Sequence, residues 1–285
     1  MTAERKKLIV TGANGQLGQE LVRSKDERYD IIGLDRKGLD VTDLVQCKQA
    51  LAEHKPSGII HAAAYTAVDR AEAEPDEAYR VNALGTRNLA VAAREANVKL
   101  CLISTDYVFD GQGVQPYNEY DQTNPQSIYG KSKRAGEMLL QSICPTYFIV
   151  RTSWVYGKFG NNFVKTMLNL ARDKNELQVV RDQVGSPTYT KDLAMFLFDL
   201  IQTEAYGIYH ASNTGTCSWF EFAQAIFEES EIQVKLTPCT TAEFPRPAPR
   251  PLYSVLDHSA IRQSGFKDLP PWRSALRSFL SELEQ

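Results

Sequence analysis

Between Lys7 and Arg181, short apolar runs alternate with longer amphipathic stretches. The runs are rich in β-branched residues and predict strands at Lys7–Thr11, Asp30–Asp35, Gly58–Ala64, Lys99–Thr105, Tyr147–Thr152 and Gln178–Arg181. The stretches between them predict helices at Gln16–Ser24, Asp43–Lys55, Pro75–Asn97, Ser127–Ser142 and Asn162–Asp173. This alternation indicates an α/β fold, a doubly wound parallel sheet with helices on both faces.

The helix predicted at Pro75–Asn97 has one polar residue on its apolar stripe. Pro75 suits the first turn of a helix, and the acidic Asp76 and Glu77 favour the positive end of the helix dipole. Small residues on the inward face predict a close approach to the sheet, and Asn82 lies on that face. We expect the Asn82 amide to be buried, either hydrogen-bonded in the core or as part of a site.

The C-terminal part of the chain has a different pattern. Gly207–Ser212 predicts another strand, and Ser218–Glu229 predicts an amphipathic helix with aromatic anchors. The segment Pro245–Pro251 reads PRPAPRP, which is typical of an extended arm, a linker or a polyproline ligand. Folded sequence resumes at Tyr253, so we favour a rigid arm that lies across the protein.

Composition narrows the class of protein. The chain has 285 residues, 43% hydrophobic and 24% charged, with a formal net charge of −3. That length suffices for one large core or two unequal domains, and the near-neutral charge argues against nucleic acid as a partner. The longest apolar run, Leu193–Phe198, is too short for a membrane helix, and Leu8–Val10 is too short for a secretory signal. We expect a cytoplasmic protein without a membrane partner.

Cysteine and histidine residues are scattered along the chain. The five cysteines contain no C-x-x-C pair, so we expect reduced and mostly buried thiols; they are Cys47, Cys101, Cys144, Cys217 and Cys239. The four histidines form no H-E-x-x-H motif and no cluster; they are His54, His61, His210 and His258. We therefore expect no catalytic zinc.

A glycine-rich loop joins the first predicted strand to the first predicted helix. It reads GANGQLG from Gly12 to Gly18, which gives a tight turn, backbone N–H groups close to a pyrophosphate and a helix N-terminus facing its charge. Asp35 ends the second strand seventeen residues after Gly18, where an acidic residue can accept from a ribose hydroxyl. The sequence predicts a dinucleotide cofactor held by Gly12, Asn14, Gly15, Gln16, Leu17 and Gly18.

Two adjacent residues give conflicting indications of which cofactor binds. Asp35 would accept from the 2′-hydroxyl of NAD(H), whereas Arg36 would pair with the 2′-phosphate of NADP(H). We expect both NADPH and NADH to bind.

Three residues indicate the chemistry. Tyr129 and Lys133 are four residues apart and share one helix face. Thr105 ends a parallel strand, at the sheet edge where open α/β sheets bind ligands. A lysine ammonium near a tyrosine lowers the phenol pKa toward the working range of an acid–base catalyst. The set predicts ketone reduction, with Tyr129 as proton donor, Lys133 beside it and Thr105 bonded to the carbonyl.

The same helix has an apolar stripe beside this pair. The stripe consists of Ile128, Ser132, Ala135, Leu139 and Ile143. Tyr129 and Lys133 follow it by about 100° around the helix, which places them at the edge of the core.

Further motifs extend over nearly the whole chain. They are HAAAYTAVDRAE (His61–Glu72), STDYVFDG (Ser104–Gly111), YGKSK (Tyr129–Lys133), RTSWVYG (Arg151–Gly157), GNNFVKTML (Gly160–Leu168) and RPLYSVLD (Arg250–Asp257). With these motifs the sequence resembles the extended short-chain dehydrogenases, and most closely the dTDP-4-dehydrorhamnose reductases. The resemblance implies reduction of dTDP-4-dehydro-6-deoxy-L-mannose to dTDP-L-rhamnose with NADPH or NADH.

The resemblance also implies roles for individual residues. Tyr129 is then the proton donor, Lys133 positions it and the nicotinamide ribose, and Thr105 binds the keto group. Sugar-nucleotide contacts are implied for Asp106, Tyr107, Trp154 and Arg250, although Trp154 could instead be a core aromatic residue. Further cofactor contacts are expected at Asp40, Val41, Ala63, Ala64, Tyr65, Thr66 and Asn82.

The expected architecture is a Rossmann-type domain with a smaller C-terminal substrate-binding α/β portion. We assign 1–152 and 177–213 to the dinucleotide-binding domain, and 153–176 and 214–285 to the sugar-nucleotide domain. Some members of the family hold magnesium at a dimer interface through acidic residues. Glu20 fits that pattern, but Lys191 stands beside Asp192, so we doubt a magnesium site and expect a monomer or weak homodimer.

Other functions stay open at this point. Another nucleotide-sugar reductase, an epimerase or a dehydratase would use the same fold, although Asp106 alone does not complete the carboxylate pair of a dehydratase. A non-catalytic NADP-binding regulatory subunit is a further alternative. The intact set of Thr105, Tyr129 and Lys133 argues against it.

Overall fold

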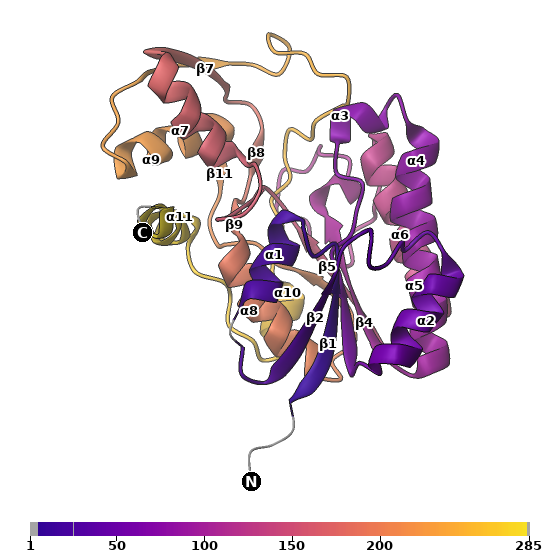
Figure 1. The fold of residues 1–285 in the computed structure, drawn as a ribbon. Coiled ribbons are helices and arrows are strands. Elements are labelled where there is room, and N and C mark those ends of the chain that lie inside the picture. The colour runs from indigo at the N-terminus through magenta and orange to yellow at the C-terminus, as the bar shows by residue number, and fades with distance from the viewer. Residues whose placement is uncertain (1–4, 25, 284–285) are drawn as a thin grey trace.

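Six parallel strands form the central sheet of the computed structural model, which describes residues 5–24 and 26–283 (Figure 1). Their order is β10-β5-β4-β3-β1-β2, and each neighbouring pair is parallel. The chain direction across the sheet reverses between β1 and β3, so the predicted doubly wound α/β fold is confirmed. The strands are β1 (Lys6–Thr11), β2 (Tyr29–Leu34), β3 (Gly58–His61), β4 (Lys99–Thr105), β5 (Tyr147–Thr152) and β10 (Gly207–His210).

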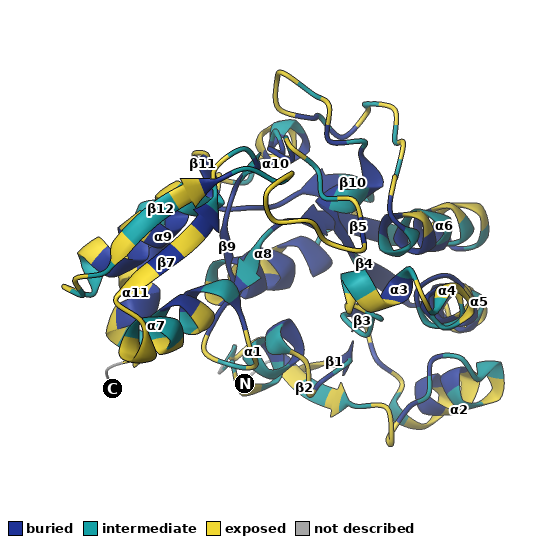
Figure 2. Cartoon of the chain, turned by 90° about the horizontal axis from the view of Figure 1, so that it is seen from above, coloured by how far each residue is buried: buried dark blue, intermediate teal, exposed yellow. Residues whose placement is uncertain are grey.

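Helices cover both faces of this sheet (Figure 2). One face packs against α1 (Gln16–Arg23), α8 (Thr190–Ile201) and α10 (Ser259–Gln263), and the other against α2 (Leu44–His54), α5 (Thr86–Ala96) and α6 (Ile128–Ile143). Helix α8 contains the apolar run Leu193–Phe198, most of which is buried. A helix covered on most sides has little amphipathic pattern, which is why the sequence did not predict it.

The helix predicted over Pro75–Asn97 is present but interrupted. A π-helical turn, η1 (Arg80–Gly85), separates α4 (Pro75–Tyr79) from α5. A Cβ on Gly85 would lie 2.8 Å from Val41 Cγ2, so the small residue permits the expected close packing. Two further short helices lie nearby, α3 (Val68–Ala71) and the 3₁₀ turn η2 (Asp106–Val108).

A second hydrophobic cluster lies beside the sheet, at the upper left of Figure 1. It is built from α7 (Phe163–Asp173), α9 (Trp219–Glu229), α11 (Trp272–Leu283) and the paired strands β7 (Glu176–Val180) and β12 (Lys235–Cys239). The short strands pair β6 (Val155–Tyr156) with β9 (Thr188–Tyr189), and β8 (Val184–Gly185) with β11 (Cys217–Ser218).

The strand predicted at Gln178–Arg181 was wrongly placed in the central sheet. As β7 it alternates exposed and buried residues, the pattern of a strand covered on one face only. The two-domain division of the chain stays a prediction.

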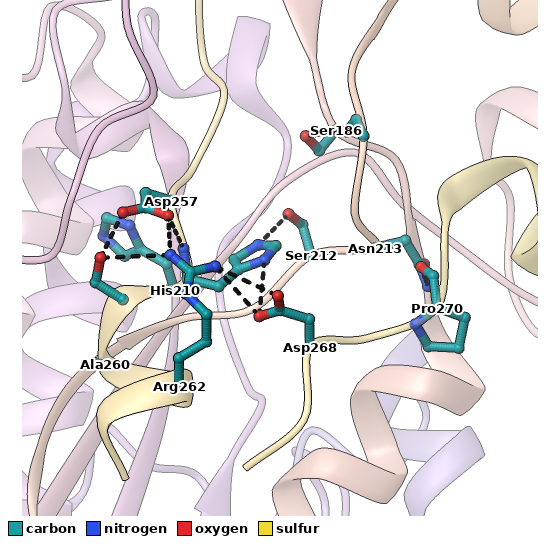
Figure 3. Close-up of polar contacts among 12 residues, drawn as sticks. Ser186, His210, Ser212, Asn213, Asp257, Ala260, Arg262, Asp268 and Pro270 are labelled. Atoms are coloured by element: carbon teal, nitrogen blue, oxygen red, sulfur yellow. Dashed lines mark hydrogen bonds and ion pairs between the residues drawn. The ribbon is translucent and has the colours of Figure 1, made fainter. Parts of the chain in front are cut away.

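The segment after the proline-rich arm returns to the central sheet, where α10 packs against β10. Figure 3 shows polar contacts in this region. The Ser212 Oγ lies 2.9 Å from His258 Nε2, and Asn213 Nδ2 donates to the Pro270 carbonyl oxygen at 3.0 Å. These bonds hold α10 against the sheet, although the predicted division places it with the smaller portion.

All five cysteines are free and buried, as the sequence predicts. Burial raises the pKa of the Cys47 thiol to about 12. Across the described residues, no helix combines the length and apolar character needed to cross a membrane.

Candidate active site

A cavity of about 990 Å³ opens beside the residues that follow β1, β3 and β4. These are carboxyl ends of parallel strands at the point where the strand order reverses, the usual ligand site of such sheets. Most predicted site residues line it: Gly12, Asn14, Gly15, Gln16, Leu17, Gly18, Arg36, Asp40, Val41, Ala63, Ala64, Tyr65, Thr66, Thr105, Asp106, Tyr107, Tyr129, Lys133 and Trp154. Three others, Asp35, Asn82 and Arg250, lie outside its lining.

The glycine loop is shaped to hold a phosphate. Gly12 has φ of +68°, and a Cβ there would lie 2.6 Å from the Ala63 nitrogen. A Cβ on Gly18 would lie 2.1 Å from the Gly12 carbonyl oxygen. Helix α1 begins after Gly15, which has no side chain to bond the first N–H groups. Side chains at Gly12 and Gly18 would collide with the backbone, so glycine lets the loop turn tightly and α1 pack close to β1 and β3. The free N–H groups at the start of α1 then fit the pyrophosphate of a dinucleotide.

Asp35 and Arg36 take different places after β2. Asp35 Oδ2 accepts from Asn14 Nδ2 at 2.7 Å, and Oδ1 accepts from the amides of Lys37 and Gly38, each at 3.0 Å. These bonds, led by the one from Gly38, hold the pKa of the Asp35 carboxyl below its usual value. The carboxylate stabilises the turn, while Arg36 lines the cavity.

Asn82 is buried beside the cavity, and both its amide oxygen and its amide nitrogen have hydrogen-bond partners. Its Oδ1 accepts from the Tyr65 amide at 2.8 Å, and its Nδ2 donates to the Tyr65 carbonyl at 3.1 Å and to Ser132 Oγ at 2.9 Å. It therefore joins η1 to α6 and to the loop after β3. Asn82 is a core asparagine that also positions the cavity residue Tyr65.

The three predicted catalytic side chains meet where β4 ends beside α6. Thr105 is the last residue of β4, and its Oγ1 accepts from the Tyr107 amide at 3.2 Å. Lys133, only 2% exposed, donates from Nζ to the Ile103 carbonyl oxygen at 2.7 Å. Tyr129 lines the same cavity one helical turn before Lys133.

Burial shifts the pKa of both members of this pair. Burial raises the pKa of the Tyr129 phenol, and a hydrogen bond with Thr105 opposes the rise. Burial lowers the pKa of Lys133 to about 8, and the Glu137 carboxylate opposes the fall. Lys133 bonds a carbonyl here and is not among the groups that shift the Tyr129 pKa, so the predicted lowering by Lys133 stays a prediction. At neutral pH, Tyr129 is a neutral phenol that can donate a proton, and Lys133 is a cation.

The buried face of α6 also differs from the predicted stripe. Its buried residues are Gly130, Ser132, Lys133, Gly136, Glu137 and Leu140, whereas Ile128, Ala135, Leu139 and Ile143 are half-buried. A Cβ on Gly136 would lie 2.4 Å from the Asn82 carbonyl oxygen, so glycine sets this close contact. Hydrophobic periodicity misplaced the face because two charged side chains are buried on it.

Asp106 stands beside the reacting groups. Its Oδ1 accepts from the Thr105 hydroxyl at 2.9 Å. Burial raises the pKa of its carboxyl to about 6, with hydrogen bonds from Ser254 and Thr105 opposing the rise. It is a buried acceptor in the cavity wall.

Arg250 reaches this region from the proline-rich arm. Its Nη1 donates to the Tyr107 hydroxyl at 3.1 Å, and its Nη2 donates to Asp69 Oδ1 at 2.8 Å. The Tyr107 ring stands edge-on to Tyr129, with 5.5 Å between centroids. The prediction of an arm lying across the protein is confirmed.

Trp154 is both a cavity residue and a packed aromatic residue, and its contact with the sugar nucleotide stays a prediction. It lines the cavity, and its ring stacks on Trp219 with centroids 3.6 Å apart. Its φ of +47° is uncommon for a bulky residue, and such strain concentrates at functional sites.

Some cavity residues were missed. Thr152 and Ser153 lie at the end of β5, so the strand-end rule could have found them. No pattern in the sequence indicated the contact between the glycine loop and the part of the chain that holds the second hydrophobic cluster. Gln16 Nε2 donates to the Val155 carbonyl oxygen at 3.1 Å, and Gln16 Oε1 accepts from Asn162 Nδ2 at 2.9 Å. The loop glutamine therefore fastens the two parts of the chain.

The carboxylates considered for magnesium have partners within the chain. Glu20 Oε2 accepts from Thr190 Oγ1 at 2.9 Å, and Asp192 Oδ2 accepts from Asn213 Nδ2 at 2.7 Å. Across the part of the chain that the structure describes, no three histidine, cysteine or acidic side chains gather as a metal site.

Known proteins match nearly the whole chain. A family model described as the RmlD substrate binding domain matches residues 6–285. The spore coat polysaccharide biosynthesis protein SpsK of Bacillus subtilis is 47% identical over 277 residues, 97% of each chain. A dTDP-4-dehydrorhamnose reductase of Aggregatibacter actinomycetemcomitans is 42% identical over 292 aligned positions, covering 98% of this chain and 99% of that protein.

A solved structure extends the likeness to three dimensions. The crystal structure of dTDP-4-dehydrorhamnose reductase from Bacillus anthracis in complex with NADP matches with a TM-score of 0.96 and 49% identity. The match covers 98% of this chain and 100% of that one. The chain belongs to the RmlD substrate binding domain family.

Proposed function

We propose that this protein reduces the 4-keto group of dTDP-4-dehydro-6-deoxy-L-mannose to dTDP-L-rhamnose with NADPH, and accepts NADH as well. The observation that carries the proposal is the meeting of Thr105, Tyr129 and Lys133 at one cavity with the glycine cradle. Similarity over nearly the full length to proteins named dTDP-4-dehydrorhamnose reductase supports this choice of substrate.

The residues divide the chemistry between them. The nicotinamide, when bound, supplies the hydride for the carbonyl carbon. Tyr129, a neutral phenol, gives its proton to the carbonyl oxygen, and the Thr105 hydroxyl turns from Asp106 Oδ1 to donate to the same oxygen. The Lys133 cation stabilises the phenolate that remains. Asp106 is placed to accept from a sugar hydroxyl.

Arg250 and Tyr107 are the proposed partners of the sugar nucleotide's diphosphate side, because a guanidinium can hold two phosphate oxygens at once. We expect Arg250→Met to raise KM for the sugar nucleotide about tenfold, the cost of one charge-assisted interaction. KM for NADPH should stay unchanged. Arg246→Met is the matched control, since Arg246 is on the same arm but exposed and stacked on Phe244. Equal effects of both substitutions would contradict the assignment.

Arg36 is the proposed partner of the 2′-phosphate, since Asp35 is bonded within its own turn. We expect Arg36→Ala to raise KM for NADPH about tenfold and leave KM for NADH within about twofold. The matched control is Lys37→Ala, an exposed neighbour that does not line the described cavity. A wild-type KM ratio that already exceeds a thousandfold would contradict dual cofactor use.

One assay tests the function and its rivals. The purified protein is incubated with NADPH and a set of dTDP-4-keto sugar epimers, and NADPH absorbance and product stereochemistry are followed. We expect consumption of NADPH with the L-rhamnose precursor and a single alcohol product. Faster turnover of another keto sugar favours another nucleotide-sugar reductase, and cofactor binding without turnover favours the regulatory subunit.

The remaining proposals concern assembly. We propose a monomer or weak homodimer without a magnesium bridge. For the division of the chain, we propose that 1–152 and 177–213 bind the cofactor and that 153–176 and 214–285 bind the sugar nucleotide, except that β7 packs in the second hydrophobic cluster and α10 on the central sheet. A stable dimer that separates when a chelator is added would overturn the proposed oligomeric state.

A further inference from the structure

A fully buried carboxylate lies one helical turn beyond Lys133 on α6. Glu137 Oε1 accepts from Ser104 Oγ at 2.6 Å and from Arg151 Nε at 3.0 Å. Its Oε2 accepts from Arg151 Nη2 at 2.9 Å and from Arg134 Nη1 at 3.1 Å. Four donors from three elements therefore converge on one side chain.

The partners of Glu137 come directly before cavity residues. Ser104 precedes Thr105 on β4, and Arg151 precedes Thr152 on β5. The strands pair Ser104 with Arg151 and Thr105 with Thr152. Glu137 thus fastens α6 to both strands at the level where all three elements reach the cavity.

Stability alone is a weak reason for this arrangement. Replacing a buried ion pair by well-packed apolar residues is often neutral or stabilising, because two charges lose their hydration on burial. What Glu137 adds, and an apolar residue could not, is a negative charge one helical turn from the Lys133 ammonium.

We propose that Glu137 is a positioning residue for the reduction, which keeps Lys133 a cation and fixes Thr105 opposite Tyr129 without touching either ligand. The inference rests on the proposed function. It adds to that function a buried group that the reaction scheme itself does not use.

Several groups around Lys133 could affect its charge. The titratable and charged ones are Tyr129 and Glu137 on α6, His61 at the end of β3, Asp106 after β4 and Arg151 on β5. Burial lowers the pKa of Lys133 to about 8, and Glu137 is the group that raises it. Burial, with Lys133 nearby, lowers the pKa of His61 to about 3, so the imidazole is neutral and adds no charge at neutral pH. Removing the carboxylate should therefore lower the lysine pKa into the neutral range.

The test is the pH profile of kcat with saturating NADPH and keto sugar. Wild-type activity should fall above about pH 8, as Lys133 loses its proton. In Glu137→Gln we expect this alkaline limb to move down by about one pH unit, as when one opposite charge is lost nearby. At pH 8, kcat then falls about fivefold relative to wild type, because the protonated fraction of Lys133 drops from about a half to about a tenth. KM for the sugar nucleotide should change less than about twofold, because ground-state binding is untouched.

Two variants separate charge from packing. Arg134→Gln removes the partly exposed donor to the same carboxylate and should keep the wild-type limb. Glu137→Asp keeps the negative charge and should restore most of the wild-type alkaline limb. A merely structural role would lower the melting temperature and the yield while leaving the limb of the folded fraction in place.

Glu137→Gln leaves Arg151 buried without its counter-charge, which can prevent folding. The double variant Glu137→Gln, Arg151→Met removes both charges. We expect its alkaline limb to lie below the wild-type limb, but by less than in the single variant, because a neighbouring cation is lost as well. A wild-type limb in either variant, measured on protein that binds NADPH fully, would overturn the inference. A wild-type protein that binds NADPH but reduces no keto sugar would instead refute the proposed function.

Discussion

Tyr129→Phe is expected to lower kcat by about 10²–10⁴-fold, the usual contribution of a positioned general acid, while NADPH binding is kept. The substitution removes one hydroxyl and leaves a ring that packs edge-on against Tyr107. Burial keeps the phenol protonated at neutral pH, so the lost group is the proton donor itself. Stopped-flow measurement of NADPH oxidation gives kcat, and quenching of protein fluorescence gives the cofactor Kd.

The matched control for this substitution is Tyr147→Phe. The Tyr147 hydroxyl accepts from Gln141 Nε2 at 3.3 Å on the exposed side of α6, at the opposite end of β5 from the cavity. Its loss should leave kcat unchanged. If Tyr129→Phe keeps more than about a tenth of wild-type kcat, the proton comes from another group.

The parts of the site that the sequence predicted are those with local geometry. The glycine spacing after β1, the threonine at the end of β4 and the Tyr129–Lys133 pair each follow from a short segment and its place in an alternating pattern. Their structural positions agree because a parallel sheet brings all its strand ends to one edge. Resemblance to a family then supplied the substrate, which no spacing could give.

What the sequence missed depends on contacts between distant segments. From the sequence, Glu137 has the pattern of an exposed helical residue. In the structure it is buried, because Ser104 on β4 and Arg151 on β5 donate hydrogen bonds to its carboxylate. Asp35 follows the pattern of a ribose acceptor, a role that stays a prediction, but its hydrogen bond from Asn14 Nδ2 had no signal in the sequence. The pairing of β7 with β12 joins segments that lie far apart along the chain, so periodicity alone could not place β7 outside the central sheet.

The misses on α6 have a common physical cause. Binary patterning treats charged residues as solvent-facing, which fails where a buried charge is paired. On α6 that failure rotated the predicted buried face and put Lys133 at the edge of the core, whereas it is almost fully enclosed. The error fell on residues that serve the site, where local rules are most often broken.

Gly18→Ala is expected to weaken NADPH binding about a hundredfold, the second of the two largest effects. An added Cβ would stand 2.1 Å from the Gly12 carbonyl oxygen and 2.9 Å from the Ala13 Cα, both backbone atoms that cannot swing away. The start of helix α1 must then move away from the loop that follows β1. This movement takes the free N–H groups of α1 away from the pyrophosphate. Overpacking of this kind costs about 3 kcal/mol, equivalent to roughly two powers of ten in Kd.

Gly15→Ala in the same loop provides the graded comparison that links the loss to this contact. A Cβ on Gly15 would meet only the Gly12 carbonyl oxygen, at 3.2 Å, and its φ of −74° suits any residue. Its NADPH affinity should therefore fall less than about tenfold, measured by fluorescence titration of both variants. Equal losses in the two variants would mean that any added methyl group disturbs the cradle. The 2.1 Å approach would then not be what requires glycine at position 18.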